Sequence, residues 1–397
     1  MTIERIRIGL LWTQFSAYHK DRCEAVGRRL SDRCIVRAVQ VSTKSEVYAW
    51  EPTADAVGTE AVTLFPGQVF EKIPVHKRLW AEYKALRVCK MVGIGIPYSE
   101  KEIILLAWML RLSGVRVIMM SATKYDDFPR QVWFEVLKCM LLMVYRGAIV
   151  GGRRQAEYLR FLGFRRRPVL PGYNSVGLKR VREQGLAMGG KADVAFEDRH
   201  FIFVGRFVRK KHLATLFEGY AAYVAQAGEG ARRLKLAGGG ELQPALEAHA
   251  AELGIAHLVD FLGFLTADEV ARELASSLAL ALVSEEEQWG LVVNEALAFG
   301  LPIIASNQIG ATDALIRNMI NGYVVELGSV TGIAFAMADI ASSKERWEEL
   351  SRESQNRGWL ADTERFADAV ELMVFPDAQP ALERITAFKR ELRLTAG

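Results

Sequence analysis

Short apolar runs alternate with segments of helical periodicity along the first half of the chain. The runs rich in aliphatic and β-branched residues predict strands over Ile6–Trp12, Cys34–Val41, Ala61–Phe65, Lys90–Ile96, Val115–Met120 and Gly147–Gly152. Helical patterns lie between them, for example over residues 99–114 and 129–147. In the first of these, Ser99 and Glu102 have the spacing of a capping box, and Gly114 marks the end. Nearly continuous apolar strands separated by helices are typical of a parallel sheet covered on both faces.

A second series of the same kind begins near residue 200. Its predicted strands are Phe201–Gly205, Arg233–Gly238, Leu258–Gly263, Leu278–Ser284 and Leu301–Ser306. Residues 182–199, between the two series, contain paired glycines and mixed charges, which favour an interdomain linker. After about Ser342 the chain is helical and polar to its end. The pattern therefore predicts an α/β protein of two doubly wound, Rossmann-like domains, residues 1–185 and residues 199–360.

Length and composition agree with a two-domain globular enzyme. A chain of 397 residues is too long for one ordinary core, and half of it is hydrophobic while a quarter is charged. No apolar run approaches the roughly 20 residues that span a bilayer, and the start lacks the features of a signal peptide. We therefore expect a cytoplasmic location. The cysteines occur singly and the histidines are dispersed, so no metal or redox site is predicted; the cysteines are Cys23, Cys34, Cys89 and Cys139.

The net charge of +4 hides a strong asymmetry between the two halves. Residues 1–190 carry 31 Lys+Arg against 17 Asp+Glu, a balance of +14, and the remainder carries 20 against 30, a balance of −10. Such asymmetry usually indicates a partner. Nucleic acid, anionic lipid and a phosphorylated acceptor all fit the basic half, and so does a solvated basic face with no partner.

The helical pattern of residues 129–147 also places apolar side chains along one stripe. This spacing is typical of a helix face buried in a core. Together with the basic balance, it also fits an anionic membrane surface, at which a cytoplasmic protein would be attached peripherally to the inner face. The residues of the stripe are Trp133, Phe134, Leu137, Leu141 and Val144.

Unusual residues of the second half follow predicted strands. Because ligands of open parallel sheets bind beyond the carboxyl ends of the strands, these residues are expected at one edge. In "VGRFVRKKH", Arg206 leaves a strand and Lys211 opens the next helix, so both cations suit a diphosphate. In "LAGGGEL", the glycines 238–240 permit close approach of a ligand to the backbone, although an ordinary tight turn explains them equally well.

The stretch "EEEQWGLVVNE" places two carboxylates around a turn. Glu287 lies in the loop after a strand, a helix is expected from about Gly290, and Glu295 falls in its second turn. One carboxylate could face a reacting group while the other binds vicinal hydroxyls. Alternatively, the acidic run 285–287 is a solvated segment that is favourable near a helix N-terminus.

Four segments in this order resemble the donor domain of retaining GT-B glycosyltransferases of family four. They are "GRFVRKK", "LAGGGE", "DFLGFLTADEV" and "SEEEQWGLVVNEALAFGLPIIASNQIGATDALI", and the resemblance covers about Phe201 to Val325. The family's signature of two glutamates separated by seven residues is matched by Glu287 and Glu295. The resemblance implies two Rossmann-like domains that face each other across a cleft. It also implies that C-terminal helices, residues 361–397, cross back to the first domain.

The resemblance implies roles for individual residues. Arg206 and Lys211 would hold the donor's diphosphate, and Glu287 would contact the donor sugar, so these three would form the catalytic set. Glu295 would bind the ribose hydroxyls. Further donor-binding positions are Gly205, Gly239, Gly240, Gly290, Leu291 and Val292. No Asp-x-Asp occurs, so no metal and no cofactor is expected. The donor would be a nucleotide-diphosphate sugar, with uridine favoured over guanosine.

The N-terminal half matches the family less well. The usual glycine-rich turn after the first strand is replaced by "WTQFSAYHKDR", in which Tyr18 and His19 resemble a pattern that some members carry. In "SATKYDDFPR", Lys124 and Asp126 or Asp127 could touch donor or acceptor, and structural roles for all these residues stay open. We expect transfer with retention to a saccharide or lipid-linked acceptor, in cell-surface polysaccharide or glycoconjugate synthesis. No nucleic-acid partner is expected.

Three other kinds of function share some of these sequence features. A sugar epimerase or a phosphorylase could use the same architecture. A catalytically inactive scaffold that binds anions or membranes would explain the basic half, but not the joint presence of the two cations and two glutamates. A dehydrogenase is disfavoured because "GGGEL" lacks the third glycine of a dinucleotide fingerprint.

Overall fold

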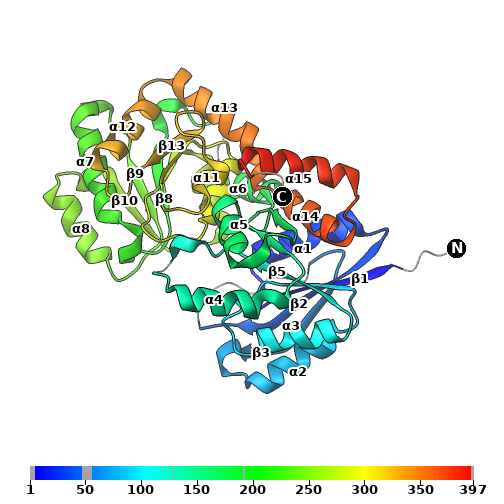
Figure 1. Ribbon diagram of the computed structural model, residues 1–397. Coiled ribbons are helices and arrows are strands. Elements are labelled where there is room, and N and C mark those ends of the chain that lie inside the picture. Colours follow the sequence, from blue (N-terminus) through cyan, green and yellow to red (C-terminus); the bar gives the residue numbers. More distant parts are fainter. Residues whose placement is uncertain (1–4, 47–55, 128, 191–192, 395–397) are drawn as a thin grey trace. The chain divides into compact units, whose positions relative to one another are not determined.

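The computed structural model describes residues 5–46, 56–127, 129–190 and 193–394, which form two compact units (Figure 1). Unit 1 comprises the described residues up to Ser175 and those from Thr363 onward, and unit 2 is Val176–Asp362. The segment predicted as a linker begins inside helix α6 (Leu178–Ala187), and its residues 191–192 lie outside the described residues. Because α6 packs against α9 and α10 of unit 2, the unit boundary lies before this helix.

Unit 1 contains a seven-stranded sheet in the order β3-β2-β1-β4-β5-β6-β7, and all of its pairs are parallel. The strands are β1 (Ile6–Trp12), β2 (Cys34–Lys44), β3 (Glu60–Val69), β4 (Met91–Ile94), β5 (Arg116–Ser121), β6 (Ala148–Val150) and β7 (Val169–Pro171). The α-helices are α1 (Ala17–Leu30), α2 (Val75–Leu86), α3 (Ile103–Leu112), α4 (Val132–Leu141), α5 (Arg153–Leu159), α14 (Glu364–Val374) and α15 (Gln379–Glu391). The predicted parallel sheet is confirmed.

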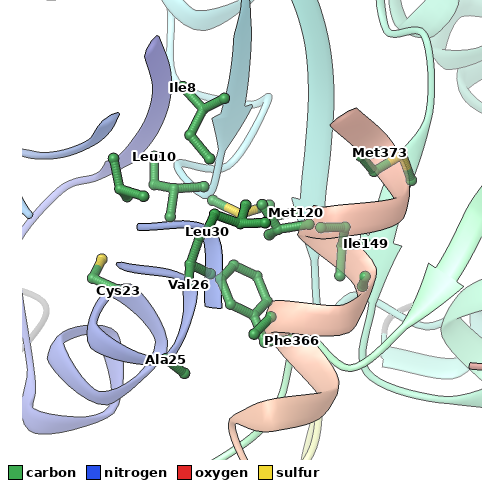
Figure 2. Close-up of a cluster of buried hydrophobic side chains, with 14 of the residues drawn as sticks. Ile8, Leu10, Cys23, Ala25, Val26, Leu30, Met120, Ile149, Phe366 and Met373 are labelled. Atoms are coloured by element: carbon green, nitrogen blue, oxygen red, sulfur yellow. The ribbon is translucent and has the colours of Figure 1, made fainter. Parts of the chain in front are cut away.

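The core of unit 1 joins the two ends of the chain. Figure 2 shows Leu10 of β1 and Val26 of α1 in the same buried cluster as Phe366 and Met373 of α14. All four side chains are at most 2% exposed. The apolar face of α14 can leave water only against α1 and the sheet, so the C-terminal helices are an integral part of this unit.

The start of α3 differs from the predicted capping box. The helix begins at Ile103 with Glu102 as its N-cap residue, and no side chain caps it. Glu102 is buried, and its carboxylate lies 2.7 Å from Nε of Arg78 in α2. The capping box of Ser99 and Glu102 was therefore wrong, because the carboxylate pairs with a buried arginine of the neighbouring helix.

Glu82, one turn after Arg78 in α2, is fully buried near the Arg78–Glu102 pair. Burial, with the negative charge of Glu102 adding to it and Arg78 opposing it, raises the pKa of Glu82 to about 8. The neutral form is favoured in the folded state, so this carboxyl stabilises the fold below its unfolded pKa of about 4.5, and the contribution is lost as the pH rises to about 8. Between pH 5 and 8 we expect the melting temperature to fall less in Glu82→Gln than in the unsubstituted protein.

The measurement is a series of thermal melts across this pH range. Glu157→Gln, which changes a half-exposed carboxylate of α5, serves as the control and should follow the unsubstituted protein. Equal slopes in all three proteins would contradict the neutral state of Glu82.

Unit 2 contains a six-stranded parallel sheet in the order β10-β9-β8-β11-β12-β13. Its strands are β8 (His200–Val204), β9 (Leu234–Ala237), β10 (Val259–Gly263), β11 (Ser277–Leu282), β12 (Ile303–Ser306) and β13 (Gly322–Val325). Its α-helices are α6, α7 (Leu213–Ala227), α8 (Gln243–Glu252), α9 (Ala267–Ala275), α10 (Leu291–Ala298), α11 (Thr312–Leu315), α12 (Val330–Ala341) and α13 (Lys344–Ala361). β8 lies between β9 and β11, so the loops after these three strands are neighbours.

The apolar stripe of residues 129–147 is mostly exposed. A helix face packed in a core would have all five side chains of the stripe buried. Of the five, only Val144 is buried, and it lies in the short helical turn after α4. Trp133, Phe134, Leu137 and Leu141 are all more than a third exposed on α4. Among the described residues, no helix is both long enough and apolar enough to span a bilayer.

Candidate functional site

The loops after β8 and β9 touch through their backbones. The amide of Gly205 donates to the carbonyl of Ala237 at 2.9 Å, and the amide of Phe207 donates to Gly239 at 2.8 Å. A Cβ atom on Gly238, whose φ is +136°, would lie 1.9 Å from the carbonyl oxygen of Gly205. A side chain at Gly238 therefore cannot be accommodated without moving the loop that carries Arg206.

Arg206 follows this contact and is exposed. Within the described part of the chain, no carboxylate pairs with its guanidinium. An exposed arginine without an acidic partner keeps its fork of donors available for an anion such as a phosphate. The loop after β8 therefore presents Arg206 as an unneutralised cation at the edge of the sheet.

Lys211 is the last residue of the short helical turn Arg209–Lys211. Helix α7 begins two residues later, at Leu213. The ammonium of Lys211 donates to a carboxylate oxygen of Glu287 in the loop after β11, and both side chains are mostly buried. The backbone joins the same two loops, because the amide of Glu285 donates to the carbonyl of Lys210 at 2.8 Å. Two further pairs flank this contact, His212–Glu285 at 3.3 Å and Lys210–Glu286 at 3.9 Å.

The residues after Glu287 form a tight, well-anchored turn into α10. The carbonyls of Glu287 and Trp289 accept from the amides of Gly310 and Ala311 at 3.1 and 3.0 Å. Trp289 is buried, and its indole N–H donates to Asn294 at 2.9 Å. These contacts fix the entry into the helix.

Gly290 is the N-cap of α10 and has a φ of +90°, a conformation that favours glycine. The first amides of α10, at Leu291 and Val292, belong to the group that has no intrahelical acceptor, and the helix dipole adds positive potential there. Glu295 lies in the second turn of α10 and is half-buried. The predicted helix start near Gly290 agrees with the structure.

In unit 1, His19 has a structural contact that the sequence did not reveal. It lies in the first turn of α1, and its Nδ1 accepts the backbone N–H of Ser16 at 3.1 Å. The ring lies 5.0 Å from that of Trp12. Burial, together with the nearby charge of Arg22, holds the pKa of His19 well below its usual range, so the imidazole is neutral at pH 7. Tyr18, beside it, is half-buried.

Lys124 follows β5 and is 1% exposed. Its ammonium lies 3.3 Å from Asp126 and 3.1 Å from Asp127, so two carboxylates share its charge. Asp126 is exposed and also lies 3.4 Å from Arg154 of α5. The structure thus joins the two predicted residues Lys124 and Asp126 in one ionic cluster.

A family model matches most of unit 2 by sequence, and several curated proteins resemble part of the chain. The family described as "Glycosyl transferases group 1" matches residues 191–357. N-acetyl-alpha-D-glucosaminyl L-malate synthase of Bacillus anthracis is 31% identical over 173 residues, which cover 44% of this chain and 43% of that protein. D-inositol 3-phosphate glycosyltransferase of Rhodococcus jostii is 31% identical over 173 residues, covering 42% of this chain and 38% of that protein. The match thus spans about two-fifths of each curated relative.

Solved structures resemble nearly the whole chain. Sucrose-phosphate synthase of Thermosynechococcus elongatus aligns with a TM-score of 0.65 at 18% identity, covering 94% of this chain and 99% of that one. Anabaena HepE in complex with UDP and glucose aligns with a TM-score of 0.66 at 13% identity, covering 93% and 99%. The chain has the GT-B fold. The predicted fold class, two Rossmann-like domains of GT-B type, is thereby confirmed.

Within this GT-B protein, the structure brings some of the predicted residues into direct contact. Lys211 forms an ion pair with Glu287, and the backbone of Gly205 contacts the glycine turn of residues 238–240. Arg206, Gly290 and Glu295 are placed by the same set of neighbouring strands, in the loops after β8 and β11 and in α10. No group of three or more His, Cys, Asp or Glu side chains that could hold a metal ion occurs among the described residues.

Two features of this candidate site were not predicted from the sequence. The first is that Lys210, Lys211 and His212 lie opposite Glu285, Glu286 and Glu287; the signal was a basic "RKKH" after one strand and an acidic "EEE" after its neighbour. The second is Phe264, which follows β10 and is 80% exposed, with its ring against Gly239. A phenylalanine directly after the predicted strand Leu258–Gly263 was its only trace in the sequence.

Proposed function

We propose that this protein is a retaining glycosyltransferase that moves a sugar from a nucleotide-diphosphate sugar to a saccharide or lipid-linked acceptor. The observation that carries the proposal is the Lys211–Glu287 pair, which lies in the loops that also carry the unneutralised Arg206 and lead into the N-terminus of α10. A diphosphate needs fixed positive charge and amide donors, and a sugar needs a carboxylate acceptor for its hydroxyls. These groups come from adjacent strands of one sheet.

In the proposed complex, Arg206 and Lys211 bind the diphosphate and the amides of Gly290, Leu291 and Val292 cap its oxygens. Glu287 accepts hydrogen bonds from hydroxyls of the donor sugar while it orients Lys211. Glu295 accepts hydrogen bonds from the ribose hydroxyls. Gly205, Gly239 and Gly240 keep side chains away from the backbone that the donor approaches.

The reaction proceeds on one face of the sugar. The bond between the anomeric carbon and the diphosphate oxygen breaks, and the acceptor oxygen forms a new bond to that carbon on the same side. The acceptor's proton passes to the departing diphosphate oxygen, so no separate base is required. Arg206 and Lys211 stabilise the negative charge that develops on the diphosphate. Fixed charges of this kind are usually the largest contribution to catalysis.

We propose a uridine diphosphate sugar as donor, with a guanosine diphosphate sugar as the alternative. Anabaena HepE, which shares the fold, is described in complex with UDP and glucose. A relative from Mycobacterium tuberculosis is described as GDP-mannose-dependent. Another, from Salmonella typhimurium, is a lipopolysaccharide 1,6-galactosyltransferase, in line with a role in cell-surface glycoconjugate synthesis. For the acceptor, Tyr18, His19, Lys124 and Asp126 of unit 1 are the proposed contact residues.

Nucleotide binding tests the placement of this site. In a thermal-shift panel of UDP, GDP and their sugars, we expect a nucleotide diphosphate to raise the melting temperature of the unsubstituted protein. Arg206→Ala and Glu295→Ala should each weaken binding about 10- to 100-fold, because each removes hydrogen bonds to a charged group worth about 1.5–3 kcal/mol. Isothermal titration with the best ligand gives the dissociation constants.

Arg209→Ala is the matched control, because Arg209 is an exposed arginine of the same loop. We expect its affinity to stay within about twofold of the unsubstituted protein, as is usual for a solvated surface charge. If Arg206→Ala and Glu295→Ala bound the nucleotide as tightly as Arg209→Ala does, the donor site would lie elsewhere.

A further inference from the structure

Helix α4 of unit 1 has its apolar side chains outside and its acidic side chain inside. Glu135 is the one residue of the helix that is buried. Val132, Trp133 and Val136 are 77%, 61% and 56% exposed. We call the exposed apolar set the α4 face: Val132, Trp133, Phe134, Val136, Leu137, Met140, Leu141, and the neighbouring Met143 and Phe161. A surface helix of a globular protein normally shows the opposite arrangement.

Polar contacts hold α4 in this orientation. The carboxylate of Glu135 accepts from the hydroxyl of Tyr158 in α5 at 2.7 Å and from Lys138 at 2.6 Å. Lys138 lies on α4 itself, but Tyr158 lies on α5, so a rotation of the helix that buried Trp133 would break the hydrogen bond between Glu135 and Tyr158. The exposure of the apolar residues is therefore built into the packing.

Arginines surround one end of the α4 face. Arg111 donates to the carbonyl of Met143 at 3.0 Å, and Arg167 donates to the carbonyl of Leu142 at 2.7 Å. Burial lowers the pKa of Arg167, and the positive charges of Arg111 and Arg146 lower it further, so these three cations lie near one another. Arg146, Arg165 and Arg166 are exposed, and within the described residues none of the three pairs with a carboxylate.

We propose that the α4 face docks onto an anionic lipid bilayer. Tryptophan, phenylalanine, leucine and methionine side chains suit the boundary between headgroups and acyl chains, and adjacent arginines suit lipid phosphates. A second copy of this chain fits less well, because symmetric pairing through the α4 face would bring two sets of unneutralised arginines together. The docking rests on unit 1 alone and does not depend on the proposed transferase activity.

Vesicle flotation of the full chain tests this proposal. We expect binding to vesicles that mix phosphatidylcholine with phosphatidylglycerol, little binding to phosphatidylcholine alone, and weaker binding as salt is raised. Arg165→Glu/Arg166→Glu should bind at least about 30-fold more weakly, because two cations near an anionic surface contribute about 1 kcal/mol each. Trp133→Ser/Phe134→Ser should lose binding to a similar or greater extent, because it removes the inserted aromatic rings.

Matched controls come from unit 2. Phe335→Ser changes a side chain that is 57% exposed, and Arg352→Glu changes an exposed arginine, and both should bind vesicles like the unsubstituted protein. Thermal melts of every variant establish that it is folded, and nucleotide binding measured on the same variants should be unaffected. Loss of binding in the controls too, or no binding of the unsubstituted protein to anionic vesicles, would overturn the proposal. So would dimers without lipid that Trp133→Ser/Phe134→Ser abolishes.

Discussion

Lys211→Met is expected to slow cleavage of the bond between the donor sugar and the nucleotide diphosphate by about 100- to 1,000-fold. Lysine and methionine have similar length, so the substitution removes the charge while it largely keeps the space filled. The remaining carboxylate of Glu287 would then face the diphosphate without its partner, which adds repulsion to the loss of a stabilising cation. Losing one fixed donor to a developing negative charge typically has an effect of this size. The rate is measured with the donor that gives the largest thermal shift, with water as acceptor.

Lys210→Met is the matched control for this prediction. Lys210 precedes Lys211, and its ammonium lies 3.9 Å from a carboxylate oxygen of Glu286, with both side chains well exposed. We expect it to retain turnover within a few-fold. A double-mutant cycle of Lys211→Met with Glu287→Gln would reveal coupling between the two, since contacting groups are non-additive. Equal losses in Lys210→Met and Lys211→Met would mean that the loop contributes only general positive potential.

Asp368→Asn is expected to destabilise unit 1 by about 3–5 kcal/mol. Asp368 of α14 is fully buried, and its carboxylate pairs with Arg29 of α1, with Arg365 at 3.0 Å and with Arg384 of α15 at 2.6 Å. Asparagine keeps the shape but removes the charge, so three guanidinium groups would face each other around a neutral amide. Removing one partner of a buried ion pair typically costs this much. The loss of unfolding free energy is measured by urea unfolding, with hydrogen exchange of the α1 and α14 amides as the readout for unit 1.

Glu364→Gln is the comparison, because Glu364 pairs with the same Arg29 but its side chain is 37% exposed. An exposed pair contributes about 0–1 kcal/mol, so this variant should lose little stability. A loss for Asp368→Asn no larger than that for Glu364→Gln would mean that water reaches the buried carboxylate.

The sequence predicted most strands of the fold and missed two strands at sheet edges. β1 lies where it was predicted, over Ile6–Trp12, because Arg7 is the one polar residue in this run of seven. The edge strands β7 and β13 were missed, since they span only Val169–Pro171 and Gly322–Val325 and contain the proline and glycine that usually mark turns. The inverted helix α4 could not be foreseen, because its orientation depends on a partner of Glu135 on another helix.

The candidate site was predictable where its residues directly follow a strand in the sequence. The glycine turn, the two cations and the start of α10 could be placed from strand ends alone, because parallel strands bring those ends together. Pairing across loops could not be placed, since the register of Lys211 against Glu287 depends on the loop backbones. For Lys124 and His19, the sequence showed polar residues near an edge, but their burial depends on packing that no local pattern encodes.

The path of the chain also sets the order in which the two units can form during translation. Unit 2 enters and leaves through adjacent positions, where the amide of Val176 donates to the carbonyl of Ala361 at 3.0 Å. Every residue of that unit has therefore been synthesised once Asp362 has been added. Unit 1, begun first, still lacks Phe366 and Val370 at that point, which belong to its buried core. On the ribosome, the second unit can reach its native state while the first must wait with an incomplete core.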